Sequence, residues 1–180
     1  MSITTQTLLW LFPITFMFHD FEEILFWEAW LNKHGAEIEG RIPAFMAKRV
    51  SAIVKKSTAQ AALPICLIFS LTVLSTFVAA EYGNYELFLL ASGVFFVHAF
   101  MHLGQALILR SYVPAIVTSA LIIIPYSLIL FGRLTEEGIV TWTGLLIHFL
   151  VGVILLLPFI LLMHQVGDYL LHKITQRLVN

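Results

Sequence analysis

The sequence predicts an all-α, polytopic integral membrane protein: a bundle of five transmembrane helices with a basic interfacial helix between the first two spans. Hydrophobic residues make up 59% of the 180 residues and charged residues only 12%, about half the charged fraction of a typical soluble domain. Apolar segments long enough to cross a hydrocarbon core of about 30 Å recur along the chain. Basic residues also gather on one side of the predicted membrane.

We expect the whole chain, 1–180, to form a single transmembrane domain. Its apolar segments predict spans at about 7–30, 58–80, 85–109, 112–131 and 139–163, each close to the roughly 20 residues that a helix needs. The stretch at about 42–56 has apolar residues at helical spacing and a mostly basic polar face, which is typical of a helix lying in the membrane interface. Residues 164–180 are predicted to be a cytoplasmic amphipathic tail.

The basic residues predict an orientation with the N-terminus outside and the C-terminus in the cytoplasm, because Lys and Arg accumulate in cytoplasmic loops. We expect the membrane to be a bacterial inner (plasma) membrane. With five spans, Arg133 is the one basic residue outside. The cytoplasmic side then holds Lys33, Arg41, Lys48, Arg49, Lys55, Lys56, Arg110, Lys173 and Arg177.

Composition also limits the classes of partner. The net charge is −1, so the molecule as a whole has no electrostatic attraction for nucleic acid. The single cysteine, Cys66, rules out an intrachain disulfide and argues against a cysteine-based metal site. The expected partners are the lipid bilayer and a lipid or other apolar small molecule, and the sequence leaves the oligomeric state open.

The first predicted span is unusual because it contains ionisable residues, which cost about 2.5–3.5 kcal/mol each at the centre of a membrane helix. They gather in the segment HDFEE, residues 19–23. At 100° per residue, His19, Glu22 and Glu23 share one face of the helix. Asp20 points within about 60° of Glu23 but about 160° away from Glu22, so it belongs to this face only in part. Such residues persist in a membrane when they are paired, bound to an ion or wetted by a cavity.

Two other spans contribute histidines at a similar predicted depth. In the segment HAFMHLGQ, His98 and His102 lie one helical turn apart. This spacing allows two imidazoles to bind one metal ion. In the fifth span, His148 lies between Gly144 and Gly152, where small residues would let a neighbouring helix approach.

These residue types predict a site for a divalent transition metal near the middle of the membrane, with zinc favoured and iron as the alternative. We expect one of Glu22 and Glu23 to bind the ion and the other to act as general base or acid, the pairing that metal-assisted hydrolysis requires. The predicted function is a membrane-embedded, metal-dependent hydrolase of a lipid or apolar substrate. The candidate metal ligands are His19, Glu22, Glu23, His98, His102 and His148, and the candidate catalytic residues are Glu22 and Glu23.

Three alternatives stay open at this stage. The same ligands suit a non-haem iron oxidoreductase. A proton- or ion-coupled transporter would use the glutamates as titrating groups in a wet pathway. In a non-catalytic subunit of a membrane complex, the glutamates would be protonated and hydrogen-bonded to His19 and Gln105.

The segment HDFEE in a first predicted span resembles the small membrane proteins named for their H-x-x-E-E motif. The residues that match are His19, Glu22 and Glu23. The family has no established activity, so the resemblance supports the motif as the functional centre and implies no reaction.

Overall fold

The computed structural model describes residues 3–179 except 42, 45–47, 49–50 and 52–56, and every regular element in this part of the chain is a helix. The predicted all-α class is therefore confirmed. The predicted interfacial helix at 42–56 lies largely outside the described residues. The helices are α1 (Thr5–Arg41), α3 (Thr58–Tyr82), α4 (Glu86–Leu109), α5 (Ile116–Thr118), the π-helical turn η1 (Ser119–Ile123), α6 (Ile124–Glu136) and α7 (Trp142–Val179).

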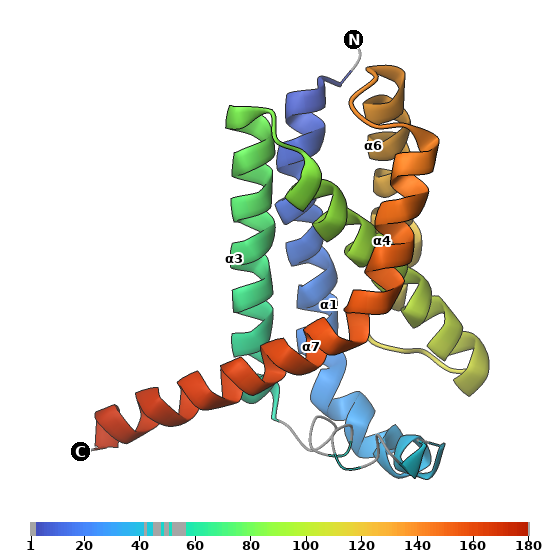
Figure 1. Ribbon diagram of the computed structural model, residues 1–180. Coiled ribbons are helices and arrows are strands. Elements are labelled where there is room, and N and C mark those ends of the chain that lie inside the picture. Colours follow the sequence, from blue (N-terminus) through green and yellow to red (C-terminus); the bar gives the residue numbers. More distant parts are fainter. Residues whose placement is uncertain (1–2, 42, 45–47, 49–50, 52–56, 180) are drawn as a thin grey trace.

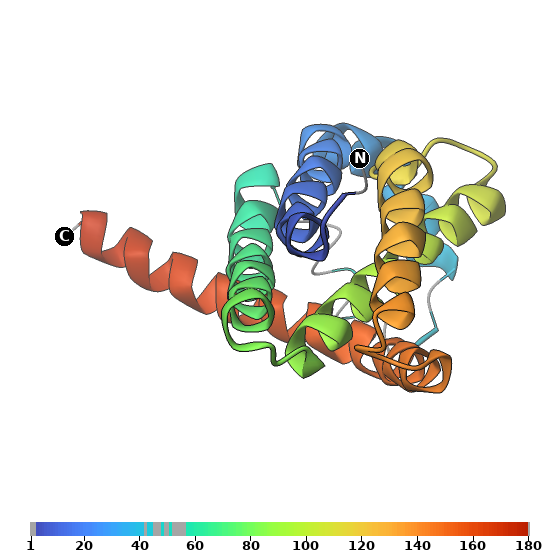
Figure 2. The same ribbon diagram turned by 90° about the horizontal axis from the view of Figure 1, so that it is seen from above.

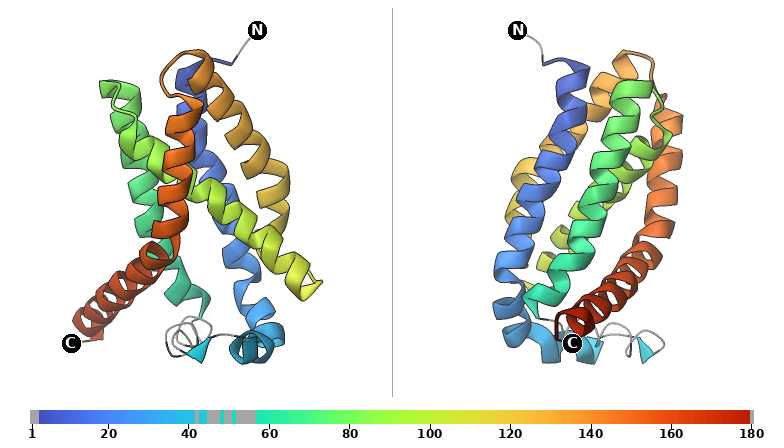
Figure 3. Two further views of the ribbon diagram at one scale, coloured as in Figure 1. Left: turned by 45° about the vertical axis from the view of Figure 1, so that its right-hand side comes forward. Right: turned by 90° about the vertical axis from the view of Figure 1, so that its left-hand side faces the viewer.

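The predicted number of spans is corrected from five to four. Within the described residues, the helices long and apolar enough to cross a membrane are Gln60–Tyr82, Glu86–Leu109, the continuous α5–η1–α6 segment Ile116–Glu136, and Trp142–Arg177. The first helix falls short because His19, Asp20, Glu22, Glu23 and Glu28 lie within it and lower its hydropathy. It nevertheless lies side by side with α3 in all views (Figures 1 and 3).

The helices form one bundle whose core combines leucines with aromatic residues. Seen from above, α1 lies between α3 and α6, and α7 runs along the opposite side (Figure 2). Helix α4 crosses the bundle obliquely and packs against α3 and α7. Phe12 of α1 is fully buried and meets Phe88 and Phe95 of α4 edge to face, with ring centroids 5.3 and 5.9 Å apart. Edge-to-face aromatic pairs add about 0.5–1.5 kcal/mol to the burial of their area, so this contact fixes α1 against α4.

Helix α7 is a single helix of 38 residues that changes direction part-way along its length (Figures 1 and 3). It contains Pro158, and a proline inside a helix removes one backbone hydrogen bond and produces a kink. After the bend, α7 crosses the start of α3, where a Cβ atom added to Gly167 would lie 2.7 Å from Cγ of Pro64. The described residues of the predicted tail, 164–179, are thus continuous with the last membrane-spanning helix.

Two glycines bring α4 and α7 into close contact. A Cβ atom on Gly152 would lie 3.3 Å from the backbone nitrogen of Val94, and one on Gly93 would lie 3.2 Å from the Phe149 ring. Small residues let helix backbones approach closely in a membrane, and Gly152 has the packing role that its sequence context indicates. Gly144 instead faces Val140 and Thr141, just before its own helix.

Replacing Gly152 by leucine is expected to destabilise the bundle by about 1–3 kcal/mol, because overpacking a tight contact costs that much. The new side chain would collide with the α4 backbone. The matched control is Gly132→Leu in α6, where a Cβ atom meets nothing within 4 Å. Thermal unfolding in detergent, followed by circular dichroism, should give a lower midpoint for Gly152→Leu only. Equal midpoints for the two variants would contradict the proposed α4–α7 contact.

Candidate metal centre

Four side chains from two helices converge inside the bundle. His19 and Glu23 come from α1, His98 and His102 come from α4, and one ligand atom of each lies within 4.8 Å of those of the others. Each helix contributes residues i and i+4, which lie on one face one turn apart. Two such pairs on packed helices produce a four-ligand cluster without any irregular backbone.

The imidazoles of this cluster are nearly in contact. The Nε2 atoms of His98 and His102 are 3.0 Å apart, and the His19 ring centroid lies 5.0 Å from that of His102 and 5.5 Å from that of His98. Ligand atoms that each lie about 2.1 Å from one tetrahedral ion are about 3.4 Å from one another. The ligand atoms that are farthest apart, up to 4.8 Å, therefore have to approach by about 1.4 Å to bind one ion, a change that side-chain rotation can supply.

Two members of the cluster are buried, and the other two, Glu23 and His98, are partly buried. His19 is fully buried and His102 is 5% exposed, and the edge of the Phe95 ring packs against His19 with centroids 5.1 Å apart. Nε2 of His19 and Oδ2 of Asp20 are buried and have no hydrogen-bond partner. Because buried polar atoms almost always have a partner, the unpartnered Nε2 of His19 indicates that this nitrogen is available to a ligand. A metal ion fits the unpartnered imidazole nitrogen, and three imidazoles with one carboxylate fit zinc or iron.

Glu22 is separated from this cluster, contrary to its predicted role as a metal ligand. Its carboxylate accepts hydrogen bonds from the Tyr112 hydroxyl (2.8 Å), the Val117 N–H (3.2 Å), and both the N–H (2.7 Å) and the hydroxyl (2.6 Å) of Thr118. Partial burial and the neighbouring carboxylate raise the pKa of the Tyr112 phenol above its ordinary value, which keeps it a neutral donor. Helical rotation separates the two glutamates, since consecutive residues point about 100° apart.

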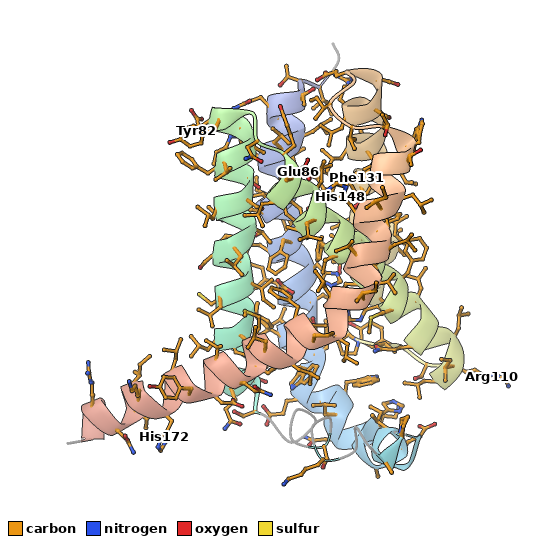
Figure 4. All side chains as sticks on the ribbon, viewed as in Figure 1. Tyr82, Glu86, Arg110, Phe131, His148 and His172 are labelled. Carbon is orange, nitrogen blue, oxygen red and sulfur yellow. The ribbon has the colours of Figure 1, made fainter. Side chains whose placement is uncertain are left out.

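His148 also lies away from the cluster. Its Nδ1–H donates to the carbonyl oxygen of Gly144 at 2.7 Å, and its Nε2 is 3.3 Å from Oε2 of Glu86 (Figure 4). Glu86 is the first residue of α4 and precedes His98 by 12 residues, which is about 18 Å along the helix. Counting residues along each span places His148 and His98 at similar depths. The count cannot show that α4 is oblique, and because of this tilt His148 faces the beginning of α4 rather than its middle.

A cavity of about 800 Å³ adjoins the cluster and lies between α1, α3, α4 and α7. Asp20, Glu23, His98 and His102 reach its wall, and most of the other lining residues are aliphatic or aromatic. The volume is in the upper part of the range for small-molecule sites. A compound held there would place its polar group at the cluster and the rest of its surface against hydrocarbon.

The family described as "protein of unknown function with HXXEE motif" matches residues 10–130, more than half of the chain. The chain belongs to the HXXEE family. The resemblance carried by His19, Glu22 and Glu23 is thereby confirmed. The HXXEE match extends from α1 into α6, so it includes the four-ligand cluster and Thr118 and ends before His148. No curated protein and no solved structure matches the chain.

Sequence reasoning missed Tyr112 and Thr118, which hold Glu22. Nothing in the segment SYVPAIVTS marks them, because their role depends on the backbone. Ala115 adopts a left-handed conformation with φ of 68° and is fully buried. Such a conformation is uncommon for a residue with a side chain. It turns the chain into α5, where the first free N–H groups of the helix point towards Glu22.

Proposed function

We propose that this HXXEE protein is a membrane-embedded, metal-dependent enzyme that acts on a lipid or other apolar substrate, with hydrolysis as the favoured reaction. One observation carries the proposal: the His19, Glu23, His98 and His102 cluster opens into a cavity of about 800 Å³ with a mainly apolar wall. A purely structural polar cluster would not need such a cavity. The apolar helices that surround it indicate association with a lipid bilayer.

The three imidazoles are the proposed metal ligands, with zinc favoured and iron as the alternative. Zinc in catalytic sites is commonly held by three protein ligands, which leaves a position for water or substrate. The ion would acidify a bound water and polarise a carbonyl group. Glu23 is near enough either to bind the ion or to take up a proton, and its position at the cavity wall favours the second role.

In the proposed reaction, the oxygen of water joins the acyl carbon of an ester or amide as the bond from that carbon to the leaving group breaks. Glu23 accepts a proton from the water and returns it to the leaving oxygen or nitrogen, so atoms and charges balance. Glu22, the other predicted catalytic residue, is held by Tyr112 and Thr118 and is not assigned to this step. Asp20 supplies a second buried carboxylate at the cavity wall.

A non-haem iron oxidoreductase is the second candidate function. Two of the histidines with Glu23 would make the two-histidine, one-carboxylate set that holds Fe(II) in many oxygenases. The elemental composition of the purified protein distinguishes this candidate from a zinc hydrolase.

We also propose that the membrane is a bacterial inner (plasma) membrane, with the N-terminus outside and the C-terminus in the cytoplasm. The two termini lie at opposite ends of the bundle, because α1 runs alongside α3 although it is too polar to count among the four apolar spans (Figure 1). Arg110 follows α4, and Lys173 and Arg177 lie in the last part of α7, towards the C-terminal end. Arg133 donates to the carbonyl oxygen of Ile3 at the N-terminal end. Positive charge favours the cytoplasmic side.

Purified protein is expected to contain one equivalent of a transition metal by elemental analysis. His19→Ala, His98→Ala and His102→Ala should each lose it, because three imidazoles hold the ion. His148→Ala and His172→Ala are matched controls that should keep it, since neither side chain belongs to the cluster. A fully folded wild-type protein that stays metal-free after dialysis against Zn²⁺ or Fe²⁺ would contradict the metal site.

Replacing Glu23 by glutamine is expected to leave the ion on the three histidines and to lower the hydrolysis of an acyl ester at least about a hundredfold, the usual contribution of a general base. The probe is 4-nitrophenyl palmitate in mixed micelles. The control is Glu28→Gln, since Glu28 binds Thr58 outside the cluster. A Glu23→Gln variant with full esterase activity would exclude Glu23 as the base, and a metal-loaded wild type without hydrolytic activity would favour the oxidoreductase.

Filling the cavity with Ile65→Trp is expected to lower kcat/KM for the palmitate ester about tenfold or more and to leave the acetate ester unaffected. Ile65 lines the cavity from α3, so a larger side chain shortens the space for a long chain. Leu74→Trp places the same residue on an exposed face of α3 and serves as the control. Equal effects on both esters would show that the chain of the substrate does not occupy the cavity.

A further inference from the structure

We infer that Thr118 and Glu22 are positioning residues that hold His19 in the tautomer that presents Nε2 to the cluster. The inference rests on the proposed metal site and adds to it a hydrogen-bonded chain from Glu22 through Thr118 to His19. It also assigns different tasks to the two glutamates of the motif. Glu23 belongs to the cluster, whereas Glu22 acts through Thr118 on the other side of the same imidazole.

The hydrogen bonds on Glu22 show that its carboxylate is purely an acceptor. Four donors approach its two oxygens: the phenol of Tyr112 and the N–H of Val117 at Oε1, and the N–H and hydroxyl of Thr118 at Oε2. A carboxylate without a proton accepts all four. Charge-assisted hydrogen bonds of this kind are about twice as strong as neutral ones, so Glu22 fixes the start of α5 against α1.

The Thr118 hydroxyl has one proton, and the geometry shows where that proton goes. Its Oγ1 is 2.6 Å from Oε2 of Glu22 and 3.3 Å from the carbonyl oxygen of Ala115. Both neighbours are acceptors, and the shorter contact to a carboxylate takes the proton. The lone pairs of Oγ1 are then free for Nδ1 of His19, which lies 3.3 Å away.

The consequence for His19 follows from the two nitrogens of a neutral imidazole, of which one donates and the other accepts. If Nδ1 donates to Thr118, Nε2 carries the lone pair. Nε2 of His19 is buried and has no hydrogen-bond partner, as expected for a nitrogen prepared to bind an ion. Metal-binding histidines generally donate their other N–H to an oxygen that fixes the tautomer and the ring orientation.

Ser119 offers a competing arrangement that the experiment has to separate. Its Oγ lies 3.5 Å from the same Nδ1 atom, at the outer limit for a hydrogen bond. If Ser119 donated to Nδ1, the proton of His19 would be on Nε2, and the imidazole could not bind an ion in that tautomer. The shorter contact to Thr118, and the carboxylate behind it, favour the first arrangement.

The test replaces Thr118 by valine, which keeps the branched shape and removes the hydroxyl. Protein labelled with ¹⁵N-histidine is studied by NMR without metal, and the His19 signals are assigned by comparison with His19→Gln. Wild-type protein should show a protonated Nδ1. Thr118→Val should lose this preference and bind Zn²⁺ about 10–100-fold more weakly, the usual effect of removing such a partner. Thr118→Ser should restore both properties, and Ser119→Ala should change neither.

Two results would overturn the inference: an unchanged Nδ1 proton in Thr118→Val, or a shift of the His19 tautomer in Ser119→Ala. Circular dichroism confirms that each variant is folded before its spectrum is interpreted. Failure of the proposed function is a separate result, because the tautomer is measured without metal. A wild-type protein that binds no ion but has Nδ1 protonated, and loses this preference in Thr118→Val, refutes the metal site and leaves the positioning of His19 by Thr118 in place.

Discussion

The structure depends on one constraint, the free-energy cost of placing imidazoles and carboxylates inside an apolar helix bundle. Each such group costs about 2.5–3.5 kcal/mol on insertion scales, and α1 carries several within five residues. The helix cannot satisfy these groups by itself. Glu22 is satisfied by the start of α5 and His148 of α7 by Glu86, whereas His19 and Glu23 of α1 meet two histidines of α4. The polar contacts therefore determine which helices must be neighbours.

Backbone features of three other segments allow this arrangement. Gly93 and Gly152 let α4 and α7 approach closely, and the aromatic contact of Phe12 with Phe88 and Phe95 fixes α1 against α4. The left-handed Ala115 and the π-helical turn that follows α5 direct two backbone N–H groups and the Thr118 hydroxyl towards α1. Irregular backbone inside a membrane is tolerated where it is buried in protein, and π-helical turns are frequent at functional sites.

The proposed enzyme combines a polar cluster, which would carry out the reaction, with an apolar cavity, which would hold the substrate. Electrostatic interactions are stronger in surroundings of low dielectric constant than in water, so an ion held by three imidazoles between apolar helices would act strongly on a bound water. A substrate from the bilayer would enter without crossing an aqueous phase. In the proposed enzyme the motif would have a divided role, in which His19 would bind the ion, Glu23 would face the substrate and Glu22 would act on the tautomer of His19 through Thr118.

The sequence by itself determined the helical class, the family and the candidate residues. Helical periodicity is local, and for this reason the pairing of His98 with His102 and the shared face of His19 and Glu23 could be predicted. Periodicity could not predict which residues of other helices those faces contact. The oblique course of α4 placed His148 beside Glu86, and the turn at Ala115 supplied the hydrogen-bond donors that hold Glu22 outside the cluster. The polar residues of α1 leave four helices in the described part of the chain, rather than the five predicted, that are apolar enough to span a membrane. Tilt, rotation and the cavity come from packing between segments far apart in the chain, so only the tertiary structure decided which of the candidate ligands converge.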